Sequence, residues 1–213
     1  MTYLDTTRLS YDTVAADYAE LLQAELAGKP LDRALLATFV ELVQATNAGP
    51  VADLGCGPGR VTAYLHELGL TTFGVDLSPR MVEVARRSYP HLRFDEGMMS
   101  DLDLSEGVLG GIVAWYSIIH TPTERLPAVF AEFHRVLAPG GQLLLAFQAG
   151  DELLYLSEAF GHPVSLEVHH RSPELVAEML AQAGFVVSAR VVREPDGWEK
   201  TPQAYLIAGK PPP

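Results

Sequence analysis

The fold is decided by residues 51–60, which read V-A-D-L-G-C-G-P-G-R. A short apolar stretch leads into a loop with glycine at every second position, namely Gly55, Gly57 and Gly59, and a helical pattern starts at Arg60. Glycine allows a sharp backbone turn and lets a ligand approach without a Cβ in the way. The start of a helix offers N–H groups that have no partner within the helix. The segment therefore predicts a strand, a ligand-binding turn and a helix in direct succession.

Outward from this segment, helix and strand patterns alternate along the chain. Asp76 ends the next strand, and Ser78 with Pro79 gives the cap and first position of a helix. We expect helices over residues 10–26, 31–46, 60–67, 78–88, 123–137 and 172–183, and strands over residues 51–54, 71–75, 92–95, 111–116, 142–147, 164–169, 185–193 and 204–208. Residues 153–160 are expected to be irregular or helical, and residues 211–213 to form a tail.

Strands that alternate with helices indicate parallel βαβ units. The link over residues 194–201 is short and polar, so the last two strands are expected to pair antiparallel. The predicted fold is α/β, a doubly wound and mostly parallel seven-stranded sheet with a C-terminal antiparallel hairpin. The length of 213 residues suits one domain. In such sheets, ligands bind at the carboxyl ends of the strands.

Composition and charge exclude several classes of function. The net charge is −12, from 27 acidic and 15 basic residues, which argues against nucleic acid and anionic membranes as partners. Cys56 is the single cysteine, so no intrachain disulfide forms, and a cytoplasmic location is expected. The sequence shows no Cys and His spacing typical of zinc, no signal peptide and no apolar run long enough for a membrane span, so no metal site is expected.

Two cofactor classes fit the glycine loop. Asp76 is placed to accept the hydroxyls of a ribose, which both classes contain. A dinucleotide usually needs G-x-G-x-x-G, whereas this loop has G-x-G-x-G with Arg60 and Val61 after it. Asp53, at the start of the loop, would repel a pyrophosphate but suits the ammonium group of a methionine moiety. The residues therefore favour S-adenosylmethionine over NAD.

These motifs resemble those of class I S-adenosylmethionine-dependent methyltransferases. Residues 51–60 look like the first motif of that superfamily, and F-G-V-D-L-S over residues 73–78 looks like the second. Residues 97–102 are similar to its adenine-side segment, residues 135–145 to the turn before the fifth strand, and residues 183–187 to the start of the closing hairpin. The resemblance covers nearly the whole chain and implies a Rossmann-like methyltransferase fold.

The resemblance also implies roles for individual residues. An N-terminal helical lid over residues 1–46 would cover a core over residues 47–210. Met98 stands at a position where many relatives carry an aspartate. The residues expected to bind S-adenosylmethionine, with S-adenosylhomocysteine as the product, are Asp53, Gly55, Cys56, Gly57, Gly59, Asp76, Leu77, Met98, Met99, Trp115 and Tyr18.

Candidates for the acceptor side lie after the fourth and fifth strands and on the first helix. His120 is the candidate general base, because a histidine has the pKa to take a proton from a hydroxyl. The alternative is a histidine that only caps the turn before Thr121. Residues expected to face the acceptor are Tyr11, Tyr116, Gln148, His169 and Arg171.

The sequence thus predicts methyl transfer from S-adenosylmethionine to a small molecule, at oxygen in preference to nitrogen or carbon. The alternatives are an NAD-dependent oxidoreductase and a protein that binds S-adenosylmethionine without catalysis. The chain is expected to act as a monomer or homodimer.

Overall fold

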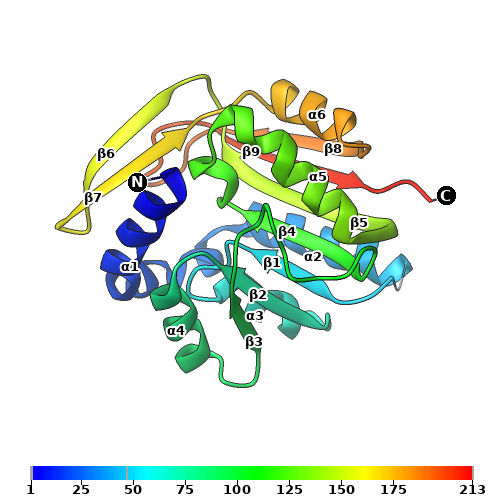
Figure 1. The fold of residues 1–213 in the computed structure, drawn as a ribbon, viewed down its shortest axis with the longest axis horizontal. Coiled ribbons are helices and arrows are strands. Elements are labelled where there is room, and N and C mark those ends of the chain that lie inside the picture. Colours follow the sequence, from blue (N-terminus) through cyan, green and yellow to red (C-terminus); the bar gives the residue numbers. More distant parts are fainter. Residues whose placement is uncertain (1, 47, 213) are drawn as a thin grey trace.

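Parallel strands form the centre of the molecule. In the computed structural model, which describes residues 2–46 and 48–212, seven strands of the described chain form one sheet in the order β3-β2-β1-β4-β5-β9-β8 (Figure 1). β9 runs antiparallel to β5 and β8, and the other neighbours pair parallel. The predicted fold class is therefore confirmed. The strands are β1 Val51–Leu54, β2 Thr72–Asp76, β3 Arg93–Glu96, β4 Leu109–Trp115, β5 Leu137–Gln148, β8 Val186–Arg193 and β9 Gln203–Gly209.

Helices cover both faces of this sheet. Side chains of α2 (Pro30–Thr46) and α3 (Arg60–Glu67) form one buried cluster with Val51 of β1. Side chains of α5 (Leu126–Val136) and α6 (Pro173–Gln182) form a second cluster with Ala52, the next residue of the same strand. Successive side chains of a strand point to opposite faces, so β1, β4, β5 and β9 contribute to both clusters. The faces are therefore closed, and the carboxyl ends of the strands are left for a ligand.

The N-terminal helix is longer at its start than the sequence predicts. α1 spans Tyr3–Leu22, and Thr2 and Asp5 form a reciprocal capping box that starts it. A short 3-10 helix, Glu25–Gly28, follows in place of the predicted end of the helix. Because α2 packs into the core, α1 is the part of the expected lid that lies over the strand ends. The limits of the expected segments include three residues that lie outside the described ones, namely Met1, Asn47 and Pro213.

Residues 153–160, expected to be irregular or helical, form a strand instead. β6 (Leu153–Ala159) pairs antiparallel with β7 (His162–His169) in a separate two-stranded sheet of the described chain. Phe160 and Gly161 form the turn, both with positive φ. β6 is exposed along nearly its whole length, so no alternation of buried and exposed residues marks it as a strand. Its conformation is set by pairing with β7, a contact that local sequence patterns do not report.

The segment before β5 also differs from the prediction. The expected helix over residues 123–137 is a 3-10 turn, Thr123–Arg125, followed by α5, and Leu137 already pairs with Leu109 in the sheet. The glycine-rich residues 138–141, expected as a turn, lie within β5, where the register with β4 shifts. A β-bulge at the start of β5 accommodates these glycine-rich residues, so they remain part of the strand.

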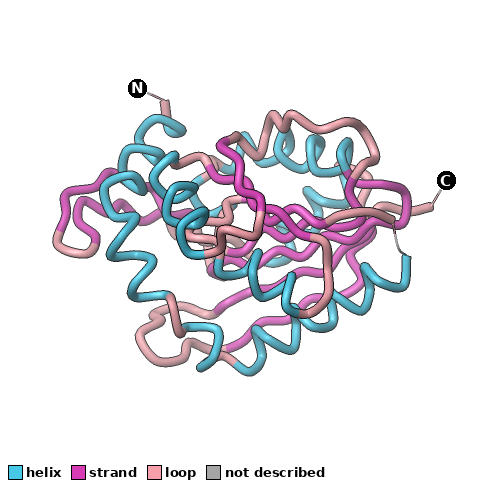
Figure 2. The backbone as a smooth tube through the Cα atoms, turned by 90° about the horizontal axis from the view of Figure 1, so that it is seen from below, coloured by secondary structure: helices cyan, strands magenta, loops and turns pink. Residues whose placement is uncertain are grey.

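Side-chain hydrogen bonds tie α1 to segments on both of its sides. The Ser10 hydroxyl donates to the carbonyl oxygen of Ser165 in β7 (3.2 Å) and accepts from the Ser165 N–H (3.0 Å). On the other side, Asp12 accepts from the Ser78 hydroxyl (2.6 Å) and the Arg80 N–H (3.2 Å) at the start of α4 (Pro79–Ser88). Figure 2 shows α1 and the β6–β7 hairpin side by side at one end of the molecule.

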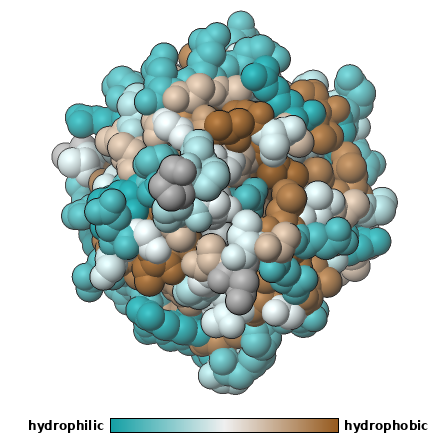
Figure 3. Space-filling view, turned by 90° about the vertical axis from the view of Figure 1, so that its right-hand side faces the viewer, coloured by the Kyte–Doolittle hydropathy of each residue, from teal (hydrophilic) through white to brown (hydrophobic). Residues whose placement is uncertain are grey.

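The opposite end carries a mixed surface. Figure 3 shows hydrophobic residues there in patches that alternate with hydrophilic ones. Within residues 2–46 and 48–212, no helix combines the length and the apolar character needed to cross a membrane.

Replacement of Ser10 by alanine is expected to loosen the β6–β7 hairpin. The change removes both hydrogen bonds to Ser165 and leaves that backbone N–H and C=O without their partner, at a local cost of about 1–3 kcal/mol. Amide hydrogen exchange should show faster exchange at Ser165. Thr13→Ala is the matched control, because the Thr13 hydroxyl bonds only to Leu9 within its own helix. Equal exchange at Ser165 in wild type and Ser10→Ala would contradict the assignment.

Candidate cofactor and acceptor site

A cavity opens where β1, β2 and β4 end, beneath α1. This is the edge at which a doubly wound sheet binds its ligands. A smaller recess adjoins it at the glycine loop. The cavity is lined by the predicted residues Tyr11, Tyr18, Gly55, Gly57, Asp76, Leu77, Met98, Met99, Trp115, Tyr116 and His120, and the recess adds Asp53 and Cys56.

Asp76 joins two loops at the centre of the cavity. Its carboxylate accepts from the Gly57 N–H (2.7 Å) and from the Ser78 N–H (2.8 Å), so it holds the glycine loop to the start of α4. Burial raises the pKa of Asp76 to about 6, against the effect of these N–H donors. A carboxylate oxygen has lone pairs beyond those used here, so Asp76 is able to accept ribose hydroxyls as predicted.

The recess is lined by the carboxylate residue Asp53 and by the cationic residue Arg60. Asp53 Oδ2 accepts from the Thr62 hydroxyl (2.7 Å), whereas Asp53 Oδ1 is buried and has no hydrogen-bond partner among the described residues. Arg60, which bonds to Glu25 at 2.8 Å through Nη2, likewise has an unpartnered, buried Nη1 in that part of the chain. Buried polar groups are normally satisfied. The two free atoms suit the ammonium and carboxylate of a methionine moiety, so the recess fits S-adenosylmethionine.

The glycine loop leaves no room for side chains at its first position. Gly55 has a φ of +74°, and an added Cβ would collide with the side chain of Ser117. Cys56 instead turns its thiol toward Gly74 and Phe94, away from solvent. Burial raises the pKa of the Cys56 thiol well above its usual value, so it packs as a small residue rather than serving as a nucleophile. Gly59 caps α3 and lies outside both hollows.

His120 sits at the rim of the cavity with both ring nitrogens in use. Nδ1 lies 2.7 Å from the main-chain oxygen of Glu167 in β7, and Nε2 lies 2.7 Å from the Tyr11 hydroxyl. A carbonyl oxygen only accepts, so Nδ1 carries the proton and Nε2 accepts from Tyr11. Burial lowers the pKa of His120 to about 4, which keeps the ring neutral near neutral pH. The ring therefore accepts a hydrogen bond from Tyr11 at the rim of the cavity.

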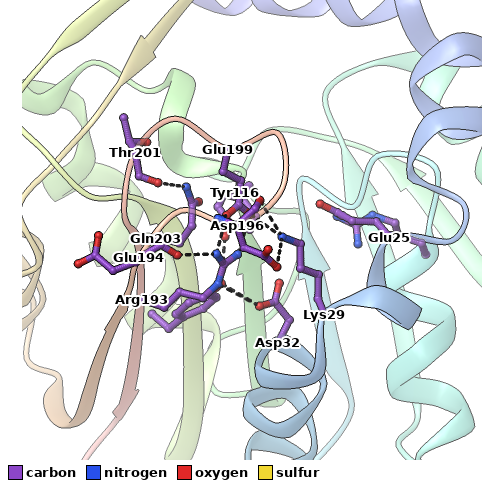
Figure 4. Close-up of polar contacts among 12 residues, drawn as sticks. Glu25, Lys29, Asp32, Tyr116, Arg193, Glu194, Asp196, Glu199, Thr201 and Gln203 are labelled. Carbon is purple, nitrogen blue, oxygen red and sulfur yellow. Dashed lines mark hydrogen bonds and ion pairs between the residues drawn. The ribbon is translucent and has the colours of Figure 1, made fainter.

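Tyr116 lines the cavity with its ring, but its hydroxyl is held elsewhere. The Tyr205 hydroxyl donates to Asp32 (2.9 Å), so in the 3.2 Å contact with Tyr205 the donor is Tyr116. Arg193 and Glu199 extend this buried network (Figure 4). Tyr116 has a φ of +55°, which is uncommon for a residue with a side chain. An acceptor would therefore meet the aromatic ring, since the hydroxyl proton is directed to Tyr205.

Arg171, predicted to pair with an acidic acceptor, is instead part of the scaffold. Its buried guanidinium donates to the carbonyl oxygens of Ile118, Thr121 and His169, so carbonyl groups take the place of an anion. Burial lowers its pKa to about 10. Gln148, His169 and Arg171 line neither the cavity nor the recess, so the structure gives no support to their predicted contacts with an acceptor.

Several residues around the cavity were missed by the sequence analysis. Arg60 follows the glycine loop directly, and a charged residue beside a predicted acidic anchor was a usable signal. Ser117 was not singled out, although it is next to Tyr116 and its hydroxyl is buried without a partner in the described chain. The first turns of α1, which add Tyr3, Leu4, Thr7 and Arg8, gave no signal, because their place over the cavity depends on tertiary packing.

Known proteins match this chain over the same region. The family model of a methyltransferase domain matches residues 51–141. An uncharacterized methyltransferase of Synechocystis is 33% identical over 91 residues, covering 43% of this chain and 43% of that protein. The malonyl-[acyl-carrier protein] O-methyltransferase of Pectobacterium atrosepticum is 28% identical over 122 residues, covering 57% of this chain and 47% of that protein. The matched segments thus span less than half the length of these curated relatives.

Solved structures extend the comparison to the whole fold. The magnesium protoporphyrin IX methyltransferase of Synechocystis, with bound S-adenosylmethionine, has a TM-score of 0.74 at 16% identity and covers 99% of this chain and 98% of its own. A methyltransferase from Methanosarcina mazei has a TM-score of 0.70 at 17% identity and covers 77% and 93%.

Fold, glycine loop and matched segment together define the class. Residues 51–141 match the model of a methyltransferase domain, and the fold matches that of solved S-adenosylmethionine-dependent methyltransferases, in agreement with the predicted resemblance. One of the matching structures holds bound S-adenosylmethionine, and the comparisons favour this cofactor over NAD. Within the described residues, no cluster of three or more His, Cys, Asp or Glu side chains is arranged to hold a metal ion.

Affinity for S-adenosylhomocysteine is expected to fall in acid. Ionised Asp76 and Asp53 accept the ligand's donors, so binding is full above the raised pKa of each and weakens as the pH drops through about 6. Calorimetry across this range should show the loss, and Asp76→Asn should make it shallower while weakening binding. Asp95→Asn, which changes a carboxylate paired with Arg93 on β3, is the control and should leave the profile unchanged. A flat wild-type profile would contradict the role of both acids.

Proposed function

We propose that this chain transfers a methyl group from S-adenosylmethionine to a hydroxyl of a small-molecule acceptor, with His120 as the general base. The observation that carries the proposal is the hydrogen bond between Tyr11 and His120 at the rim of the cofactor cavity. It joins a neutral proton acceptor to a hydroxyl beside the place where the cofactor fits. A hydroxyl acceptor needs proton removal more than an amine does, which favours methylation at oxygen over nitrogen or carbon.

Different residues would bind different parts of the cofactor. Asp76 would accept the ribose hydroxyls, and Asp53 and Arg60 would hold the charged ends of the methionine moiety. When bound, S-adenosylmethionine supplies an electrophilic methyl group. Leu77 and Met99 line the side of the cavity assigned to the adenine. In-line transfer depends on the placement of the two reactants, which these contacts provide.

His120 is oriented by a main-chain carbonyl group of the β6–β7 hairpin. The Glu167 carbonyl fixes the proton on Nδ1, and Nε2 would accept the acceptor's proton through the Tyr11 hydroxyl that already donates to it. Burial raises the pKa of Tyr11 well above its usual value, so Tyr11 stays protonated and serves as a donor or relay.

The wider proposal concerns the kind of acceptor and the setting. A net charge of −12 supports a small acceptor over nucleic acid or an anionic membrane. The relatives' names include an O-methyltransferase and a demethylmenaquinone methyltransferase, so they do not converge on one acceptor. A monomer or homodimer in the cytoplasm remains part of the proposal, and the single, buried, free cysteine is consistent with that location.

The test uses S-adenosylmethionine with a deuterated methyl group. The protein is incubated with a panel of phenols and alcohols, and products are analysed by mass spectrometry for the transferred label and for S-adenosylhomocysteine. Labelled ether with equal S-adenosylhomocysteine supports the proposal. Binding of S-adenosylhomocysteine without labelled product from any hydroxyl, amine or carbon acceptor would support the non-catalytic alternative. Label found on nitrogen or carbon would overturn the preference for oxygen.

Loss of the base is expected to slow turnover without weakening cofactor binding. His120→Gln should reduce kcat by roughly 10²–10⁴-fold, the usual contribution of a positioned base. Tyr11→Phe should have a smaller effect of the same sign. Calorimetry with S-adenosylhomocysteine serves as the control for both. His66→Gln, on α3 and outside the cavity, should leave kcat unchanged. Unaltered turnover in His120→Gln would remove His120 from the mechanism.

A further inference from the structure

A second hollow reaches His120 from the other side of α1. It is a groove between the first turns of α1 and the β6–β7 hairpin. Tyr3, Thr7 and His120 border both this groove and the cofactor cavity. The candidate base therefore stands where the two hollows meet.

The groove contains none of the predicted cofactor anchors. Asp76 and Gly57 line the cavity, and Asp53 lines the recess, but the groove is walled by α1 and by Tyr155, Leu156 and neighbouring residues of the hairpin. A cofactor held by its anchors would thus leave the groove free. A second molecule lying in the groove would approach His120 from the side opposite these anchors.

The residues that line the groove disfavour a charged ligand. Among the described residues that line it there is no lysine or arginine, and Glu167 is the one carboxylate. The α1 wall carries threonine and tyrosine hydroxyl groups, and the hairpin wall carries apolar side chains together with serine and tyrosine hydroxyls. Tyr155 at the outer rim is 71% exposed, and Leu156 beside it is 39% exposed. Such a surface suits an uncharged molecule with an apolar or aromatic body and a few hydrogen-bonding groups.

We propose that the groove between α1 and the β6–β7 hairpin binds the body of the methyl acceptor, and that this acceptor is an uncharged, elongated alcohol or phenol with an apolar extension. The proposal rests on the proposed function, because it places the reactive hydroxyl at Tyr11 and His120 and the extension along Leu156 and Tyr155. An anionic acceptor is disfavoured, since it would meet Glu167 and no cation in the groove.

Binding of a neutral probe and its anionic analogue tests this assignment. para-Phenylphenol and its carboxylate analogue are titrated by ligand-observed NMR into the full chain, with and without saturating S-adenosylhomocysteine. The neutral probe is expected to bind more tightly than the carboxylate. Leu156→Glu should weaken the neutral probe by about tenfold or more, because it places a charge in the groove. Leu154→Glu is the matched control: Leu154 is also 39% exposed on β6 but does not line the groove, so its effect should stay within about twofold.

A second variant tests the same assignment in case Leu156→Glu does not fold. Glu167→Gln retains the main-chain carbonyl that binds His120, removes the carboxylate and should narrow the difference between the two probes. Three results would overturn the inference: equal effects of Leu156→Glu and Leu154→Glu, tighter binding of the carboxylate to the wild type, or no binding of para-phenylphenol to a protein that binds S-adenosylhomocysteine. Failure to bind S-adenosylhomocysteine is a different result, which would contradict the proposed function instead.

Discussion

The Asp76 carboxylate is the interaction on which the rest of the site depends. It joins the Gly57 N–H after β1 to the Ser78 N–H at the start of α4, while the Val75 carbonyl accepts from the Gly55 and Cys56 N–H groups. Two loops that are far apart in the chain are thereby fixed as one surface. α1 attaches to the same place through Asp12, so the wall of the cavity that covers the cofactor region is tied to the residues that would bind the ribose. A buried carboxylate is stable here only because backbone donors compensate part of its desolvation.

The side of the cavity proposed for the acceptor is also held in place by partners from distant segments. His120 is held by a main-chain oxygen of β7, and Tyr116 is held by the Tyr205 hydroxyl, which in turn bonds to Asp32 of α2. Each of these side chains follows β4 and is oriented by a segment remote in sequence. Orientation by packed partners limits the rearrangement that a bound acceptor must induce. The helices and the β6–β7 hairpin thus act on the chemistry through side-chain orientation as well as through shape.

Much of this was predictable from the sequence, since the decisive features are local. The strand, the glycine loop and the helix lie within residues 51–67, and Asp76 follows at the end of the next strand. What failed depended on contacts between distant segments. β6 is a strand because β7 pairs with it, and Arg171 is buried because the carbonyl groups of residues 118–121 surround it. Arg60 was visible beside the loop, but its unpaired Nη1 emerges only once Glu25 has bonded to Nη2.

The exposed strand β6 has a consequence for how two copies of the chain meet. An edge strand with a run of apolar residues, here Leu153 to Leu156, is a template on which a second β-strand can add. Antiparallel pairing of two copies centred on Tyr155 would bring Glu152 of one copy opposite Glu158 of the other. Like charges directly opposite one another destabilise a strand pair. The acids that flank the apolar run therefore protect this edge from joining itself into a continuous sheet, while they leave its middle open to smaller, uncharged molecules.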